Sequence, residues 1–247
     1  VGINANIFDR VGAGLSVFRD SNGPISAGGI TAGASYFIPL SSEGDRKDQF
    51  SFGTSVSLYN MNFDYSKINT QDASDPLLQG SESNIFMAYA NFGVAATYRN
   101  IFAAVSVNDI ALTNDEAIVN GREPSPIKFF LNLGYDWYVG DNIYFTPSAL
   151  INLNTNSTRT IDYNLMATFF NDINSFSFGV NYRSVQNRFD SQQLQIAPVV
   201  KVRFNKFMIG ATYNLGLSDI QEYGGNSFML GVGYNFDNFI NHRGYRY

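Results

Sequence analysis

The stretch FSFGTSVSLYN, residues 50–60, decides the fold class of this chain. Its large or apolar side chains occupy every second position, at Phe50, Phe52, Val56 and Leu58, with Thr54 as a mild exception. The residues between them are mostly small or polar. Such a period of two gives a β-strand one apolar face and one polar face. The apolar face then meets either the core of a soluble sandwich or the lipid around an outer-membrane barrel.

The composition favours the membrane barrel. Of the 247 residues, 45% are hydrophobic and 15% are charged, whereas ordinary soluble domains are about 25% charged. The chain has 22 Gly, 22 Phe and 15 Tyr, and its mean hydropathy is −0.12. A run of about 18 apolar residues is absent from the sequence, which argues against a transmembrane helix.

Net charge and cysteine content exclude several classes of partner and cofactor. A net charge of −5 and a pI near 4.8 argue against nucleic acid as a partner. Without Cys, the chain as given has no disulfide, no thiolate metal site and no lipidated N-terminal Cys. The sequence opens at Val1 without an initiator Met and already inside a strand pattern. We therefore expect that an upstream part has been removed or left out.

The alternation of the opening stretch recurs along the whole sequence, for example in FSFGVNYR (176–183) and IAPVVKVRF (196–204). Helical spacing is absent from these segments, so the sequence predicts an all-β chain. We count thirteen segments, at 1–8, 11–19, 25–39, 49–60, 84–98, 101–110, 127–138, 143–153, 160–169, 176–184, 193–203, 206–216 and 226–236.

The connections between these segments alternate between short and long. The short set is 9–10, 41–48, 99–100, 139–142, 170–175 and 204–205. The longer set is 20–24, 61–83, 111–126, 154–159, 185–192 and 217–225. Short periplasmic turns and longer extracellular loops are typical of an outer-membrane barrel, whereas the connections of a Greek-key sandwich are not sorted in this way.

Strand parity predicts the size of the barrel. If 9–10 is a periplasmic turn, the first visible strand begins outside and the thirteenth ends in the periplasm. Bacterial single-chain barrels close with an even number of strands, so one further strand is expected upstream of Val1. We predict a transmembrane antiparallel up-and-down β-barrel of about fourteen strands, with the barrel over 1–236 and a periplasmic C-terminal tail over 237–247.

Several glycine- and aromatic-rich stretches follow one another in a fixed order. They are GAGLSVFRDSNGPIS (12–26), FSFGTSVSLYN (50–60), DASDPLL (72–78), NFGVAATYRNIFAAVSVNDI (91–110), LGYDWYVGDNIYFTPSALI (133–151) and the NYR of FSFGVNYR (176–183). This order of features resembles the PorP/SprF family of outer-membrane proteins, which is associated with type IX secretion in Bacteroidota. The resemblance extends over nearly the whole chain, although an Asn-Pro-rich opening segment typical of the family is absent.

The resemblance implies a function without catalysis. It implies a bacterial outer-membrane protein that acts as a partner in type IX secretion and binds or anchors a secreted surface protein or adhesin through that protein's C-terminal sorting domain. The expected partners are outer-membrane lipid, the adhesin and other type IX secretion components. The sequence itself predicts only a barrel.

The residues argue independently against an enzyme. Outer-membrane hydrolases and acyltransferases generally rely on His with Ser or carboxylates, and the single histidine is His242, after the last strand segment. The sequence shows no metal-ligand spacing of His or Cys, so we expect neither a metal nor a cofactor. Catalysis by carboxylates alone stays open as an alternative, because Asp136 and Asp162 both fall on the predicted inner face. We expect them instead to pair with lumenal Arg and Lys.

A transporter or channel for a small or hydrophobic solute is the alternative function. The predicted inner face is polar, with Asn91, Thr97, Asn132, Asp136, Asn164, Asn181, Gln195, Lys201 and Arg203. It also carries glycines that leave room for a ligand or a partner polypeptide, or that relieve strain in a curved sheet. These glycines are Gly53, Gly93, Gly134, Gly179, Gly210, Gly231 and Gly233.

The two longest connections are the expected partner surface, because binding residues concentrate on loops held by a rigid scaffold. In the first connection, DASDPLL combines acidic residues with an apolar pair after a proline. DASD lacks the pattern of a dedicated calcium loop, so a solvated loop is the simpler interpretation. The candidate contact residues are Asp72, Asp75, Pro76, Leu77, Leu78, Asn114 and Arg122.

One ion pair inside the barrel follows from register. The turn at 170–175 is short, so Phe169 is expected to pair with Phe176, and the apolar residues of both strands then share one face. The same register places Asp162 opposite Arg183 on the polar face near the outer end. We predict a lumenal contact between these two side chains that helps to fix the hairpin.

Overall fold

The computed structural model describes residues 1–23, 25–40, 48–64, 84–113, 127–155, 157–186, 190–218 and 225–236. Within these ranges every regular element is a β-strand. The strands are β1 (Gly2–Phe8), β2 (Val11–Asn22), β3 (Ile25–Pro39), β4 (Gln49–Phe63), β5 (Asn84–Tyr98), β6 (Ile101–Ala111), β7 (Lys128–Tyr135), β8 (Trp137–Tyr138), β9 (Ile143–Asn154), β10 (Arg159–Phe170), β11 (Ser175–Gln186), β12 (Ser191–Phe204), β13 (Phe207–Gly216) and β14 (Ser227–Tyr234).

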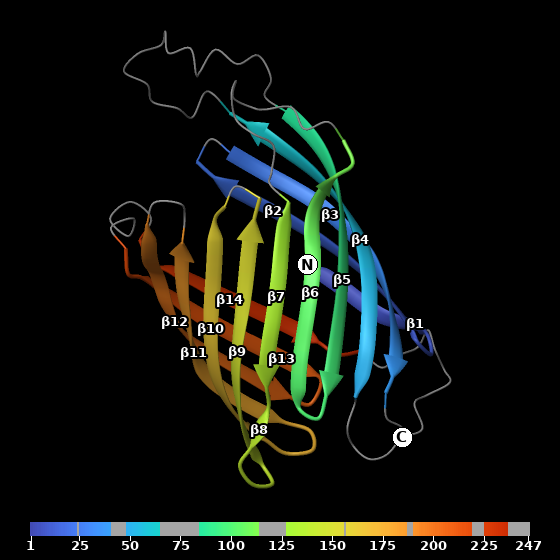
Figure 1. Cartoon of the computed structure of the whole chain (residues 1–247), viewed down its shortest axis with the longest axis vertical. Helices are drawn as coiled ribbons and strands as arrows, with labels where there is room; N and C mark the ends of the chain where they lie inside the picture. Colours follow the sequence, from blue (N-terminus) through green and yellow to red (C-terminus); the bar gives the residue numbers. More distant parts are fainter. Residues whose placement is uncertain are drawn as a thin grey trace.

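All fourteen strands belong to one antiparallel sheet in which sequence neighbours are also neighbours in space. Figure 1 shows that this sheet curls round, so that β13 and β14 cross behind β7 and β9. The up-and-down order and the all-β content confirm the predicted fold class. Two expected segments, 25–39 and 84–98, coincide with β3 and β5, and the others differ from the observed strands by a few residues at their ends.

The expected segment 127–138 is one strand with an interruption. β7 and β8 both pair with β9 in a single register, with Gly134 opposite Ser148 and Trp137 opposite Phe145. The pairing lapses at Tyr135 and Asp136, and in this register Tyr135 lies opposite Pro147, which has no N–H to donate to this side of the ladder. A second proline, Pro198, lies where the β12–β13 pairing is interrupted. Both prolines retain their place in the register on the other side, toward β10 and β11.

The described strands number fourteen because the single expected segment 127–138 is divided into β7 and the two-residue β8. The parity argument reaches fourteen in another way, by a further strand upstream of Val1. That upstream strand stays a prediction. The expected tail over 237–247 lies outside the described residues.

The two faces of the sheet differ as the alternation predicts. Phe52 and Val56 of β4 are 47% and 44% exposed, whereas Ser57 between its apolar neighbours is 2% exposed. We call the face that carries Phe52 the outer face and the face that carries Ser57 the inner face. Large apolar side chains stand exposed on the outer face of almost every strand. Such a surface is unfavourable in water and suits lipid.

Short turns at one end of the sheet have specific local causes. The two-residue turn between β5 and β6 has φ of 49° at Arg99 and 75° at Asn100, which is the left-handed pair of a type I′ hairpin. The buried Asp48 carboxylate accepts a hydrogen bond of 2.9 Å from the Arg99 backbone N–H. The Asn205 N–H of the β12–β13 turn donates to the Asn174 side chain of the neighbouring turn at 3.0 Å. These turns therefore support one another along one rim, which the turn lengths place in the periplasm.

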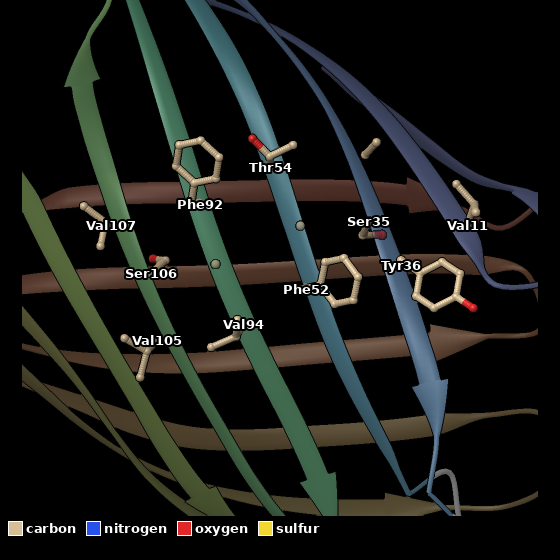
Figure 2. Close-up of a pocket in the computed structure, with 13 residues that line it drawn as sticks. Val11, Ser35, Tyr36, Phe52, Thr54, Phe92, Val94, Val105, Ser106 and Val107 are labelled. Carbon is tan, nitrogen blue, oxygen red and sulfur yellow. The ribbon is translucent and has the colours of Figure 1, made fainter.

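A shallow apolar groove of about 660 Å³ crosses the outer face of β2–β6. Figure 2 shows Phe52, Phe92 and Val94 projecting from β4 and β5 on the near side of the sheet, with the strands of the opposite wall behind them. Two outer-face side chains of the groove carry a hydroxyl, Thr54 and Tyr36. The Thr54 hydroxyl donates to the Asn91 carbonyl oxygen at 3.1 Å. The rest of the outer-face lining is apolar, as a surface against acyl chains requires.

The face assignment can be tested at two adjacent positions near the middle of β6. Val105 is 48% exposed on the outer face, and Ser106 follows it on the inner face. We expect Val105→Arg to lower the free energy of unfolding in lipid vesicles by about 2–4 kcal/mol, because it places a charge near the bilayer midplane. Ser106→Arg is the matched control and should cost less than half as much. Urea titration of vesicle-reconstituted protein measures both, and equal losses would contradict the assignment.

Candidate functional site on the inner face

A hydrogen-bond network crosses the inner face from β3 to β5. The Thr31 and Ser57 hydroxyls lie 2.9 Å apart. The Asn91 amide donates to the Ser55 hydroxyl at 3.0 Å and to the Ser57 hydroxyl at 3.3 Å. Three strands are thus joined by side chains as well as by backbone pairing, so Asn91 is the centre of this network.

A β-bulge extends the same network to β6 and β7. The register between β5 and β6 shifts at Asn91, and Asp109 on the opposite strand has a φ of 61°. Asp tolerates this left-handed conformation better than most residues. The Asp109 N–H donates to the Asn91 amide oxygen at 2.9 Å. The Asp109 carboxylate accepts a hydrogen bond from the Lys128 ammonium at 2.6 Å. The bulge therefore turns a carboxylate toward the cation of the next strand.

Aromatic rings cover the inner face on the extracellular side of this network. Phe18 packs edge-on against Tyr59 with ring centroids 5.3 Å apart, and Tyr59 lies 5.6 Å from Tyr89. Gly29 lies beneath them, and a Cβ atom there would collide with Phe18, with Tyr59 at 2.6 Å and with the Leu58 carbonyl. The glycine at this position is therefore required for the close approach of the rings.

A second network joins β10 to β11. Arg183 lies opposite Asp162 in the register, as Phe176 lies opposite Phe169. The Arg183 guanidinium donates to both oxygens of the Asp162 carboxylate, at 2.6 and 3.1 Å. The Asn181 amide donates to Asn164 at 2.8 Å and to Asp162 at 3.4 Å. This two-point geometry is the favourable one for an Arg–carboxylate pair.

Between the two networks the inner face has a small hollow of about 240 Å³. Its position follows from the register, because Asn108 lies opposite Lys128 and Leu150 lies opposite Asp162. The lining mixes amide, hydroxyl and apolar side chains, namely Ala104, Ser106, Asn108, Phe130, Asn132 and Leu150. The flanking ion pairs are each internally neutralised, so the hollow offers hydrogen bonding rather than charge.

Four inner-face glycines show two contrasting situations. At Gly134 the Phe102 ring occupies the space of a side chain, and at Gly179 the Met166 side chain and the Leu165 carbonyl do so. At Gly210 and Gly231 an added Cβ atom would meet nothing nearer than 3.7 and 3.9 Å respectively. Glycines of the first kind allow neighbouring groups to pack close to the sheet. Only those of the second kind leave open space in front of the sheet.

The carboxylates considered for catalysis have structural partners. Asp162 is held by Arg183, as expected. For Asp136 the expected cation is wrong: within the described residues its carboxylate accepts a hydrogen bond of 2.6 Å from the Thr146 hydroxyl and forms no ion pair. Within the described ranges, three or more His, Cys, Asp or Glu side chains do not come together as a possible metal site. His242 lies outside these ranges. In the described part of the chain, the arrangement offers binding surfaces rather than a nucleophile with its base.

The candidate contact residues of the two longest connections lie outside the described residues. They are Asp72, Asp75, Pro76, Leu77, Leu78, Asn114 and Arg122. They remain a prediction from the sequence.

The Lys128–Asp109 pair was not predicted from the sequence. Strict alternation treats β6 as regular up to its end, and the bulge at Asn91 shifts the register there by one residue. The dipeptide Asn108-Asp109 near the end of an apolar strand is the available signal, since Asn and Asp favour left-handed backbone.

Comparison with known proteins identifies the family of this chain. A family model described as "Type IX secretion system membrane protein PorP/SprF" matches residues 1–234. The match confirms the resemblance seen in the sequence. A comparison with curated proteins finds no match.

The Asp162–Arg183 pair can be measured with a double-mutant cycle of Asp162→Asn and Arg183→Gln. Because the Arg183 side chain is 40% exposed, solvent screening weakens the pair, and we expect a coupling energy of about 0.5–1 kcal/mol. Urea unfolding of the four proteins in lipid vesicles gives this value. A coupling energy indistinguishable from zero would show that the two groups are solvated separately.

Asn91→Ala tests the first network. It leaves the buried Ser57 hydroxyl with one partner fewer and the Asp109 N–H without its acceptor, so we expect a loss of about 1–3 kcal/mol in the free energy of unfolding. Asn132→Ala is the matched control, because Asn132 lines the hollow and the structure shows no hydrogen bond from its side chain. If the two variants lose equal stability, Asn91 is not a special position.

Proposed function

The chain belongs to the PorP/SprF family of type IX secretion system membrane proteins, and from that premise we propose that it binds a secreted surface protein, such as an adhesin, and holds it at the cell surface. The family match over 1–234 carries this proposal. The protein is a component of the bacterial outer membrane, and its all-β fold is consistent with that location. Other components of the secretion system are its expected neighbours.

The inner face supports a binding role. Its polar side chains are joined in two networks that extend from β3 to β7 and across β10 and β11. Asp136 and Asp162 are engaged in these and similar contacts. A rigid wall of this kind can hold loops and bound polypeptide in place, and it requires no chemical step.

The long connections between β4 and β5 and between β6 and β7 are the proposed contact with the adhesin. They follow strands that the Asn91 network ties together. A rigid scaffold below variable connections is a common arrangement for protein recognition. We name the segment around 72–78 because its sequence combines carboxylates with an adjacent Leu pair.

Transport of a small solute is the second candidate, and the hollow beside Asn108 and Asn132 is the observation that favours it. Liposome swelling with sugars of increasing size distinguishes the two functions. Flux that depends on solute size supports transport. A sealed barrel that purifies with a secreted surface protein supports the proposed function.

Deletion of residues 72–80 tests the contact surface directly. We expect the deletion to weaken co-purification of the secreted surface protein from the native bacterium by at least fivefold, because the main recognition segment is removed. Barrel assembly, measured by heat-modifiable migration on gels, should not change. A deletion of similar length within 114–122 compares the second connection. Unchanged capture by both deletions would contradict a role for these segments.

A further inference from the structure

The cations of the inner face fall into two groups. Lys128 and Arg183 are each bound to a carboxylate. Lys201 and Arg203, near the periplasmic end of β12, are both exposed and form no ion pair within the described part of the chain. They lie on the inner face because Val200 and Val202 occupy the outer face. Two positive charges that have no ion-pair partner among the described residues thus point into the barrel at one place.

The surface beside these cations is bare. Lys201 lies opposite Gly210, and Gly210 lies opposite Gly231, so one row across three strands has a single side chain. An added Cβ atom at Gly231 would meet only the Gly210 carbonyl at 3.9 Å. Met208 and Met229 border this row and are 39% and 65% exposed. We call this surface the cationic trough: Lys201, Arg203, Met208, Gly210, Met229 and Gly231.

The trough matches one kind of ligand. Lys201 and Arg203 are two residues apart on one strand, so their Cα atoms are separated by about 7 Å. Carboxylates at alternate positions of an extended polypeptide have the same spacing. Glycine lets a foreign backbone approach the sheet closely, and exposed Met adapts to varied side chains. The combination therefore fits an extended acidic segment better than a compact anion.

Other occupants fit less well. Lipid phosphate is on the wrong side, because the trough faces inward and Val200 and Val202 face the lipid. The chain's own segment 237–247 follows β14 at the same rim, but it contains Asp237 together with Arg243 and Arg246. Its net positive charge would be repelled by Lys201 and Arg203.

We propose that the cationic trough binds an extended, acidic polypeptide segment that enters the barrel from the periplasmic side. The identity of the partner, a secreted protein on its way to the surface, rests on the proposed function. The chemistry of the site does not rest on it, because it follows from the open glycine row and from two cations without an ion pair in the described ranges.

Binding of a defined peptide tests the chemistry with the full-length chain in detergent micelles. The probe is a fluorescein-labelled ten-residue peptide of alternating Glu and Ser, and its twin carries Gln in place of Glu. We expect anisotropy to show binding of the Glu peptide, weakening with added salt, and at least tenfold weaker binding to Lys201→Gln/Arg203→Gln. The control Arg10→Gln/Lys206→Gln removes the same charge at periplasmic turns and should change affinity by less than twofold. Equal binding of the Gln peptide, or equal losses in both double variants, would overturn the proposal.

The open space is tested separately at Gly231. Gly231→Ala adds a Cβ atom where there is room, so binding of the Glu peptide should persist. Gly231→Leu should fill the trough and weaken binding at least fivefold without removing charge. Heat-modifiable migration verifies that both variants are folded. Wild-type affinity in Gly231→Leu would show that the peptide does not lie in the trough.

Purification from the native bacterium separates this inference from the proposed function. If the wild type brings down a secreted surface protein and Lys201→Gln/Arg203→Gln brings down much less, both are supported. Equal amounts would overturn the trough as the site of that partner while the proposed function stands. If the wild type brings down no secreted protein but still binds the Glu peptide, the proposed function fails and the chemistry of the trough is supported.

Discussion

Within a bilayer, every backbone N–H and C=O group needs a partner inside the sheet, and the rest of this structure depends on that constraint. It holds the strands in continuous antiparallel pairing and leaves only the side chains free to differ between the two faces. The exceptions show how strict it is. Pro147 and Pro198 lack the N–H, and pairing is interrupted beside each of them on one side only. Both prolines lie on the outer face, so the missing ladder hydrogen bond occurs only where the proline ring faces outward.

Because backbone pairing fixes the register, the inner face is assembled row by row, and much of it could be predicted. The β10–β11 register follows from one short turn and from the requirement that Phe169 and Phe176 share a face, and this places Asp162 opposite Arg183. The same logic fails at the β5–β6 bulge. One extra residue there brings Asp109 to Lys128, and its position depends on the left-handed backbone at Asp109, which alternation does not encode. The conformations of the long connections follow from neither alternation nor turn length, so their contact residues rest on composition alone.

The glycines show a similar limit. Alternation assigns Gly134 and Gly231 to the same face, and composition treats them alike. They differ only in their cross-strand neighbours: Phe102 lies over Gly134, whereas Gly231 faces Gly210. Whether a glycine makes room for a packed side chain or leaves open space is therefore a property of the pair. The strand register must therefore be known before the structural role of a single glycine can be assigned.

These rows give the barrel wall two different surfaces. From β3 to β11 many inner-face side chains are joined by hydrogen bonds, and the charges of two ion pairs cancel locally. Within the described ranges the exceptions include Asn132 beside the hollow and the buried side-chain oxygens of Asn152 and Asn154, which have no hydrogen-bond partner. From β12 to β14 the periplasmic half carries Lys201 and Arg203, which have no such partners in the part of the chain that the structure describes, and an open row of glycines. A surface whose polar groups bond to one another is rigid, whereas a surface whose polar groups lack internal partners can form those bonds with a ligand. This difference favours a supporting role for β3–β11 and, as we propose for the cationic trough, a binding role for the periplasmic half of β12–β14, although both are built from the same alternating pattern.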